Sequence, residues 1–411
     1  MKRILSTKYL LKYRLTIYFG VISILATAIF FTEFRRCIKD VSKSSSGLGP
    51  VLTSRGQLTD VLPERTCEPH MTRQVILLTY GRSGSSLTTD IIQHEKQVYT
   101  YFEPLHNLAK SYVGKQEKYM KTYKKYLPLT SLPDYLAQAE NIVRKLMTCD
   151  YHQLPPVASK NPHMRFYDSA PMFHCMRRST TPQGEAKCLQ QGQKTCLKKL
   201  IHFLKIIRLT VRLLTSCDNR RWAGKPLVKT ESVGHLMSNY PCLQVIYLVR
   251  DPRGTFMSKK RAFVNISVDT KFEGKKFCQR VDKDIDHALK LLKAHPGRVC
   301  IVRYEDIAER PEEMSRKLYT FLHLNFTDDT LRFVFNKTQS GVNNSDIFST
   351  FRANSAEVSY AWRSRMKYQD AALFDEICRE VYYKLGYLPV NTLLHLRDRR
   401  KPLKFTKNHL L

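Results

Sequence analysis

Short apolar runs alternate with amphipathic segments along most of the chain. Runs rich in β-branched and aromatic residues predict buried strands at Gln74–Thr79, Val98–Phe102, Leu243–Val249 and Val299–Tyr304. Segments with helical spacing of apolar positions lie at Ser85–Gln93, Tyr135–Met147, Pro252–Ala262, Asp282–Leu292, Pro311–Leu322 and Gln369–Leu385. We expect Ser85 or Ser86 to cap the first helix, Pro252 to open the third, and Gly386 to end the last.

Strands that alternate with helices predict an α/β fold with a central parallel sheet and helices on both faces. We therefore expect a P-loop-like three-layer fold, whose ligand lies beyond the carboxyl ends of the strands. Leu200–Arg208 fits either a buried strand or the start of a basic helix that reaches Leu214. Tyr151–Cys196, which contains Cys175, Cys188 and Cys196, is expected to be irregular and tied by disulfides.

The N-terminal segment predicts a membrane anchor. Leu15–Thr32 carries no charged residue and is just long enough for a spanning helix. Basic residues precede it, so the tail is expected in the cytoplasm and the rest of the chain in the lumen; a cleaved signal peptide is the alternative. The predicted parts are a cytoplasmic tail (1–14), a transmembrane signal anchor (15–34), a Ser/Gly-rich stem (35–72), a single luminal domain (73–390) and a basic C-terminal tail (391–411).

Charge and cysteine content suit a luminal protein that binds anions. The 68 Lys+Arg against 36 Asp+Glu give a net charge of +32, which favours polyanions or anionic surfaces; no RNA-binding signature supports a nucleic-acid partner. The 11 cysteines suit a compartment where disulfides persist, and the odd one out is expected to be Cys37. No Cys-x-x-Cys is present, so no metal is expected. Glycan acceptors are expected among Asn265, Asn325, Asn336 and Asn343.

The loop Tyr80–Ser86, which we call the phosphate cradle, joins the first strand to the first helix. A strand, a Gly/Ser loop and a helix N-terminus are the backbone geometry that binds phosphate. Gly81 and Gly84 allow close approach, and Arg82 adds a permanent positive charge. No Lys follows Gly84, so the loop is not a Walker A motif. A plain turn between strand and helix is the alternative.

A second cationic turn, Arg250–Gly254, follows another predicted strand. Arg250 and Arg253 flank the turn, and Ser258 lies on the helix that follows. The same logic predicts a second anion site, unless Arg250 and Asp251 merely form an ion pair that caps this helix.

These two motifs together resemble the carbohydrate sulfotransferases of the Golgi, in particular those that sulfate the 6-hydroxyl of galactose, N-acetylglucosamine or N-acetylgalactosamine. Further similar segments are Tyr101–Leu105, Val302–Asp306, Arg352–Ser355, Trp362-Arg363 and Leu385–Tyr387. The family's Lys-x-x-Arg stretch is resembled by Lys205–Arg208, with Lys229-Thr230 as an alternative. The family often has Thr where Tyr80 stands, with Thr79 one position outward.

The resemblance implies the sulfate donor 3′-phosphoadenosine 5′-phosphosulfate as co-substrate and no permanently bound cofactor. It assigns the 5′-phosphosulfate to the cradle residues Arg82, Ser83, Gly84, Ser85 and Ser86, with Thr79, Tyr80 and Gly81 beside them. It assigns the 3′-phosphate to Arg250, Arg253 and Ser258, with Arg352 as a weaker match. It also implies a type II Golgi membrane protein and leaves a homodimer open.

Sulfuryl transfer needs charge stabilisation at the leaving phosphate and a base for the acceptor hydroxyl. Arg82 and the cradle N–H groups fit the first need. Glu103, at the end of a predicted strand, is the candidate base and His106 the second choice, although Glu103 fits a surface carboxylate equally well.

The acceptor is expected to be a glycan or glycosaminoglycan. Basic segments around Lys115–Lys125 and Arg397–Lys407 suit an acidic glycan, although solvated faces or contacts with anionic lipid are equally simple explanations. Two other functions stay open: a membrane-anchored glycan-binding protein without catalysis, and another nucleotide-dependent transferase.

Overall fold

The computed structural model describes residues 67–68, 71–108, 132–152, 154–160, 170–199, 201–208, 230–262, 270–341 and 350–406. All of them belong to one compact unit, Glu64–Leu411. The predicted anchor, most of the predicted stem, Cys37, Asn265, Asn343 and the Lys115–Lys125 segment lie outside the described residues. Among the residues that are described, no helix combines the length and the apolar character needed to cross a membrane.

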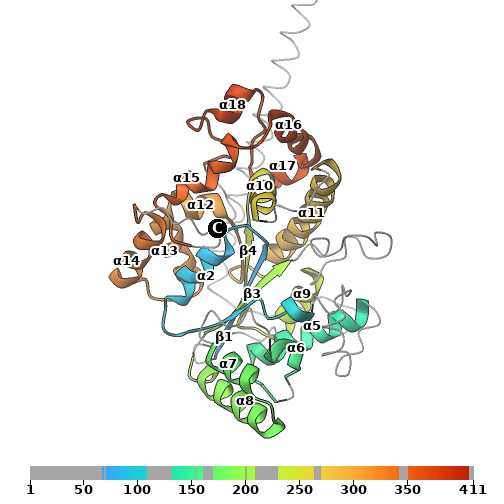
Figure 1. The fold of residues 1–411 in the computed structure, drawn as a ribbon, viewed down its shortest axis with the longest axis vertical. Helices are drawn as coiled ribbons and strands as arrows, with labels where there is room; N and C mark the ends of the chain where they lie inside the picture. Colours follow the sequence, from blue (N-terminus) through green and yellow to red (C-terminus); the bar gives the residue numbers. More distant parts are fainter. Residues whose placement is uncertain are drawn as a thin grey trace, which may run out of the picture. The chain divides into compact units, whose positions relative to one another are not determined.

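A five-stranded parallel sheet lies at the centre of this unit (Figure 1). Its strands are β1 (Arg73–Tyr80), β2 (Val98–Phe102), β3 (Ile201–Arg208), β4 (Leu243–Val249) and β5 (Val299–Arg303). They are ordered β2-β3-β1-β4-β5, and every neighbouring pair is parallel. The ambiguous segment is therefore a strand: Ile201–Arg208 pairs with β1 along its whole length and also with β2.

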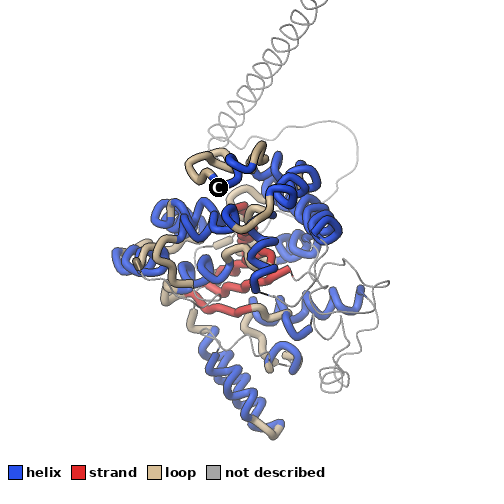
Figure 2. The backbone as a smooth tube through the Cα atoms, turned by 45° about the horizontal axis from the view of Figure 1, so that its top comes forward, coloured by secondary structure: helices blue, strands red, loops and turns tan. Residues whose placement is uncertain are grey.

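Side chains along each strand alternate between two apolar cores, one on each face of the sheet. Val75 and Leu77 face one core, whereas Ile76, Leu78 and Tyr80 face the other. The first core is covered by α2 (Ser85–Gln93), α12 (Tyr304–Glu309), α13 (Pro311–Phe321) and α14 (Asp328–Thr338). The second is covered by α5 (Leu132–Met147), α9 (Thr230–Asn239), α10 (Pro252–Ala262), α11 (Thr270–Ala294), α16 (Tyr368–Ile377) and α17 (Arg379–Leu385). Helices on both sides of the strands (Figure 2) confirm the predicted three layers.

Three predicted segments differ from the structure. The helix expected at Asp282–Leu292 is α11, which begins earlier, at Thr270, and ends at Ala294. The stretch expected to be irregular contains three helices, α6 (Pro156–Ser159), α7 (Ala170–Arg178) and α8 (Pro182–Cys196). The Thr181 side chain caps α8 by accepting a hydrogen bond from the Gly184 N–H at 3.1 Å. The single helix expected near the C-terminus is two helices, α16 and α17, separated at Cys378. Gly386 ends α17 in the left-handed conformation, as predicted.

Three short elements after α14 complete this part of the domain: the first packs on α12, the second on α10 and the third on the second. They are α15 (Ser355–Tyr360), the 3-10 turn η3 (Ala361–Ser364) and α18 (Leu393–Arg397). The buried Arg363 guanidinium holds α18 and the following turn by donating to the carbonyls of Leu396, His395, Asp398 and Lys401. The described part of the basic C-terminal tail is thus anchored on the domain.

Disulfides are present, as the cysteine content predicted. They join Cys67 to Cys242, Cys149 to Cys196, Cys175 to Cys188 and Cys278 to Cys378. Cys300 on β5 is a buried free thiol in the described part of the chain.

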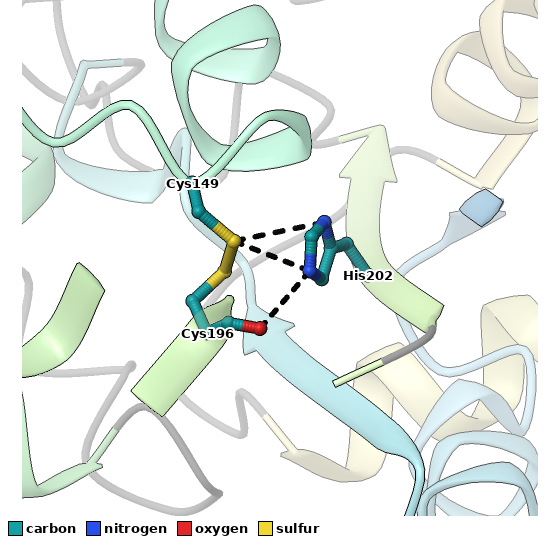
Figure 3. A group of neighbouring side chains, drawn as sticks. All are labelled: Cys149, Cys196 and His202. Carbon is teal, nitrogen blue, oxygen red and sulfur yellow. Dashed lines mark hydrogen bonds between the residues drawn. A yellow bond between two sulfur atoms is a disulfide. The ribbon is translucent and has the colours of Figure 1, made fainter. Parts of the chain in front are cut away.

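The Cys149–Cys196 bridge packs against His202 (Figure 3). Burial lowers the pKa of His202, and its Nδ1 lies 2.7 Å from the Met147 carbonyl oxygen. Nε2 lies 3.2 Å from the Cys196 carbonyl oxygen and 3.2 Å from Cys149 Sγ. The two sulfurs are bonded to each other, so this cluster cross-links the chain near the amino end of β3. The cradle lies at the opposite, carboxyl end of the sheet.

Candidate active site

The carboxyl ends of β1, β4 and β5 lie side by side. Thr79 on β1 pairs with Leu248 on β4, and Val249 pairs with Arg303 on β5. This register brings Gly81, Arg250 and Tyr304 to about the same level, immediately beyond the sheet. The two predicted anion motifs are therefore neighbours, because β1 and β4 are adjacent strands.

The cradle leaves the start of α2 open. Gly84, with φ 85°, is the N-cap of α2 and has no side chain that could cap the helix. The prediction that Ser85 or Ser86 caps the helix is wrong, because α2 already begins at Ser85. First-turn N–H groups without a cap are donors for an anion. The Ser83 hydroxyl, 1% exposed, also has no hydrogen-bond partner in the described part of the chain.

Glycine is required at position 84 for two reasons. Its positive φ suits few other residues, and a Cβ built there would overlap the Tyr304 ring. Tyr304 therefore forms one wall of the cradle. The same ring lies under the Arg250 guanidinium, 4.8 Å from Cζ to the ring centroid.

Direct hydrogen bonds join the cradle to the second motif. Arg250 Nη1 donates to the Arg82 carbonyl oxygen at 3.0 Å, and Nη2 donates to the Ser359 carbonyl oxygen at 3.1 Å. Arg82 Nε donates to Ser258 Oγ on α10 at 3.1 Å. Arg82 and Arg250 thus converge on one small region.

Positive charge is concentrated in this region. Burial lowers the pKa of Arg82, and the nearby guanidiniums of Arg250, Arg352 and Arg261 lower it further, while Tyr304 opposes them. Like charges held together are unfavourable unless a counter-charge is supplied. A bound anion with more than one charge would supply it, so the arrangement is suited to a multiply charged ligand.

Arg253 does not belong to this cluster, although the sequence placed it there. Its side chain is fully buried, and its guanidinium donates to Asp251 at 2.8 Å, to Asp375 at 2.9 Å and to the Leu388 carbonyl oxygen at 3.0 Å. It also stacks on Trp362 and Tyr382. Asp251 also accepts from the Arg253 N–H at 2.9 Å, so it occupies the start of α10. Arg253 is therefore a structural residue, and Asp251 pairs with it rather than with Arg250.

Tyr80 and Thr79, which were also predicted to contact the donor, have side chains that are engaged elsewhere, so only their backbone groups face the site. The Tyr80 side chain points into the core, where its hydroxyl donates to Asp284 and lies 3.2 Å from the Tyr247 hydroxyl. The Thr79 hydroxyl, almost fully buried, donates to the Tyr80 carbonyl oxygen at 3.3 Å. Gly81, Arg82, Ser83, Gly84, Ser85 and Ser86 form the loop and first turn of α2, as predicted.

Glu305 lies next to Arg250 and was not among the predicted site residues. It is fully buried, with Oε1 accepting from the Asp251 N–H at 3.1 Å and Oε2 accepting from the Tyr387 hydroxyl at 2.9 Å. Arg250 Nε lies 3.9 Å from Oε1. Burial raises the pKa of Glu305 to about 7, with Arg250 opposing. Its position directly after β5, within a segment that matched the family motif, was the only available signal.

Glu103 and His106 form a pair beyond β2. Glu103 Oε2 lies 3.3 Å from His106 Nδ1, and both side chains are mostly buried, at 13% and 11% exposed. Glu103 has a left-handed backbone, with φ 51°, a conformation that is uncommon outside glycine and clusters at functional sites. β3 separates β2 from β1, so Glu103 lies about two strand spacings, roughly 10 Å, to the side of β1. The strand register places it level with Leu78, two residues before the cradle begins.

Comparison with known proteins identifies the family. The chain matches the Sulfotransferase family over residues 74–328, a range that includes the cradle, Arg250 and Glu305. It belongs to the sulfotransferase family. Carbohydrate sulfotransferase 1 of Homo sapiens is 25% identical over 362 residues, covering 79% of this chain and 84% of the relative. Carbohydrate sulfotransferase 3 of Mus musculus is 24% identical, covering 77% and 68%.

Solved structures similar to this sulfotransferase include the sulfotransferase domain from the curacin biosynthetic pathway. That domain is 15% identical with a TM-score of 0.39, covering 76% of this chain and 97% of the domain. Retinol dehydratase in complex with androsterone and inactive cofactor PAP is 12% identical with a TM-score of 0.36, covering 76% and 80%.

Proposed function

We propose that this sulfotransferase moves a sulfuryl group from 3′-phosphoadenosine 5′-phosphosulfate to the 6-hydroxyl of a galactose, N-acetylglucosamine or N-acetylgalactosamine unit in a glycan. The observation that carries the proposal is the junction of the two anion motifs, where Arg250 donates to the Arg82 carbonyl and Arg82 to Ser258. One nucleotide with anionic groups at both ends can occupy both motifs. The names of the relatives, carbohydrate sulfotransferases 1 and 3, support a sugar acceptor.

Each end of the donor has its own set of residues in this proposal. The uncapped first turn of α2, the Ser83 hydroxyl and Arg82 bind the 5′-phosphosulfate. Arg250, Ser258 and Arg352 bind the 3′-phosphate. Thr79, Tyr80 and Gly81 contribute backbone only.

The reaction breaks the bond between sulfur and the bridging phosphate oxygen and forms one between sulfur and the sugar oxygen. Negative charge grows on the bridging oxygen in a loose, in-line transition state, and Arg82 with the α2 N–H groups stabilises it. The proton of the sugar hydroxyl passes to the Glu103–His106 pair. Glu103 is the proposed base, and His106, whose Nδ1 lies 3.3 Å from Glu103 Oε2, is the second candidate.

Location and assembly complete the proposal. The uncharged segment Leu15–Thr32 supports a type II anchor in the Golgi membrane with the catalytic domain in the lumen. A homodimer is compatible with this arrangement. The basic C-terminal tail supplies further positive charge for an acidic glycan.

The decisive experiment combines donor binding with transfer. Adenosine 3′,5′-bisphosphate should bind, whereas a glycan-binding protein without catalysis would ignore it and another nucleotide-dependent transferase would prefer ATP. Radiolabelled donor should then transfer sulfate to galactose-terminated or N-acetylhexosamine-terminated oligosaccharides. Matched acceptors with a 6-deoxy sugar should remain unlabelled. Equal labelling of the 6-deoxy acceptors would refute the 6-hydroxyl, and absence of binding would refute the donor.

A further inference from the structure

A buried ionic cluster joins α2, α14 and the segment that carries Arg352. Lys337 Nζ on α14 lies 3.0 Å from Asp90 Oδ2 on α2 and donates to Thr350 Oγ1 at 3.0 Å. Thr350 Oγ1 in turn donates to the same Asp90 oxygen at 2.6 Å. Asp90 and Lys337 are only 8% and 9% exposed. We call these three residues the clasp.

The backbone fixes the same segment from the other side. The Arg352 N–H donates to the Lys337 carbonyl oxygen at 2.9 Å, and the Arg352 carbonyl oxygen accepts from the Ser340 N–H at 3.0 Å. The ring of Phe351 lies under the Lys337 ammonium, 3.9 Å from Nζ to the centroid. Residues 350–352 are thus held at two points, to α2 and to α14.

The location of the clasp connects it to the cradle. Asp90 follows the cradle on the same helix, about 7.5 Å along the axis from Ser85. Arg352 is close enough to Arg82 for the two guanidiniums to interact. A buried ion pair adds little net stability compared with apolar residues of similar size. A positioning role explains its presence better than a contribution to stability does.

We propose that Asp90, Lys337 and Thr350 position Arg352 against the 3′-phosphate of the sulfate donor. The inference rests on the donor-binding role proposed above. Arg352 is the residue that contacts the ligand, and the clasp residues act only through it. Because Asp90 belongs to α2, the clasp also keeps Arg352 at a fixed distance from the 5′ end of the same nucleotide.

The test uses a mild substitution on the full chain. Thr350→Val removes the hydroxyl that joins Asp90 and Lys337 without changing a charge. It should raise the dissociation constant of adenosine 3′,5′-bisphosphate about tenfold, the effect of misplacing one charge-assisted hydrogen bond. The dissociation constant of adenosine 5′-monophosphate, which lacks the 3′-phosphate, should stay within twofold. In turnover, the donor KM should rise while kcat stays within about twofold.

A double-mutant cycle separates positioning from structural support. In an Arg352→Ala background, Thr350→Val should cause no further loss of bisphosphate binding. The pair Asp90→Asn with Lys337→Met, which removes both buried charges together, should behave like Thr350→Val and remain folded.

Three results would overturn the proposal. They are additive losses in the cycle, equal weakening of both nucleotides, or a lower melting temperature with unchanged bisphosphate binding in Thr350→Val. If the wild-type protein binds no bisphosphate, the proposed function itself fails, and the clasp proposal fails with it. If the wild type binds and Thr350→Val is unaffected, only the clasp proposal fails.

Discussion

Arg82→Gly is the sharpest perturbation of the cradle, because the backbone of Arg82 is already left-handed, with φ 72°. A residue with a side chain is strained there by roughly 1–2 kcal/mol, whereas glycine is not. Glycine therefore removes the guanidinium and relieves strain together. Arg82→Ala removes the guanidinium and keeps the strain. The two variants should lose function equally, and Arg82→Gly should be the more stable.

The expected loss follows from what the guanidinium contacts. Arg82 donates to Ser258 at 3.1 Å and lies at the uncapped start of α2. A hydrogen bond to a charged group contributes about 1.5–3 kcal/mol, so adenosine 3′,5′-bisphosphate should bind roughly 10- to 150-fold more weakly. Loss of a donor that stabilises growing negative charge typically lowers kcat by about 10²–10³-fold.

Isothermal titration with the bisphosphate and turnover with radiolabelled donor measure both effects, and thermal denaturation measures the stability difference. Arg332→Ala is a matched control, since it removes an exposed guanidinium on α14 without touching the cradle. If Arg82→Gly keeps kcat/KM within about threefold of the wild type, Arg82 is not part of the donor site and the proposed chemistry is wrong.

Three other changes test the surroundings of the site. Gly84→Ala should lower both stability and donor affinity, because its Cβ would overlap the Tyr304 ring; normal binding by titration would contradict this. Burial raises the pKa of Glu305 to about 7, above about 4.3 in an unfolded chain. The folded state therefore holds this proton more tightly, and stability should decline as pH rises between these values. In urea denaturation from pH 5 to 8, Glu305→Gln should weaken the decrease in the free energy of unfolding with pH. An unchanged pH dependence would refute this reasoning. Replacing Cys278 and Cys378 by Ala removes a disulfide between residues 100 apart. The free energy of unfolding should fall by up to about 4.7 kcal/mol, and the melting temperature should fall with it. An unchanged melting temperature would show that this disulfide does not stabilise the domain.

The sequence predicted the frame of the site because its signals are local. β1 and β4 each end at a turn that contains Arg and Gly, and a helix follows directly. The order of the residues was therefore enough to predict that Gly81 and Arg250 lie immediately after strands. The segment Ile201–Arg208 was ambiguous because β3 is buried between β1 and β2. A parallel strand in a sheet covered on both faces does not show a regular alternation of apolar and polar residues, so its pattern resembles that of a buried helix.

Long-range partners explain the errors at individual residues. Arg253 looked like a ligand because nothing nearby in sequence reveals Asp375, which lies 122 residues away and accepts from its guanidinium. The Tyr80 side chain was a different case, since Ile76 and Leu78 share its face of β1. Strand alternation was enough to place that side chain in the core.

The contrast between Arg250 and Arg253 concerns how the proposed donor site can form within a row of like charges. Both arginines have a buried carboxylate within reach, so charge alone does not distinguish them. Asp251 accepts two hydrogen bonds from the Arg253 guanidinium, at 3.0 and 2.8 Å, which neutralise it, and also caps α10 by accepting from the Arg253 N–H. Glu305 stands 3.9 Å from Arg250, and burial favours its protonated form up to about pH 7. Near neutrality Arg250 is therefore only partly compensated. Its remaining charge faces the cradle, where a phosphate of the proposed donor would complete the neutralisation.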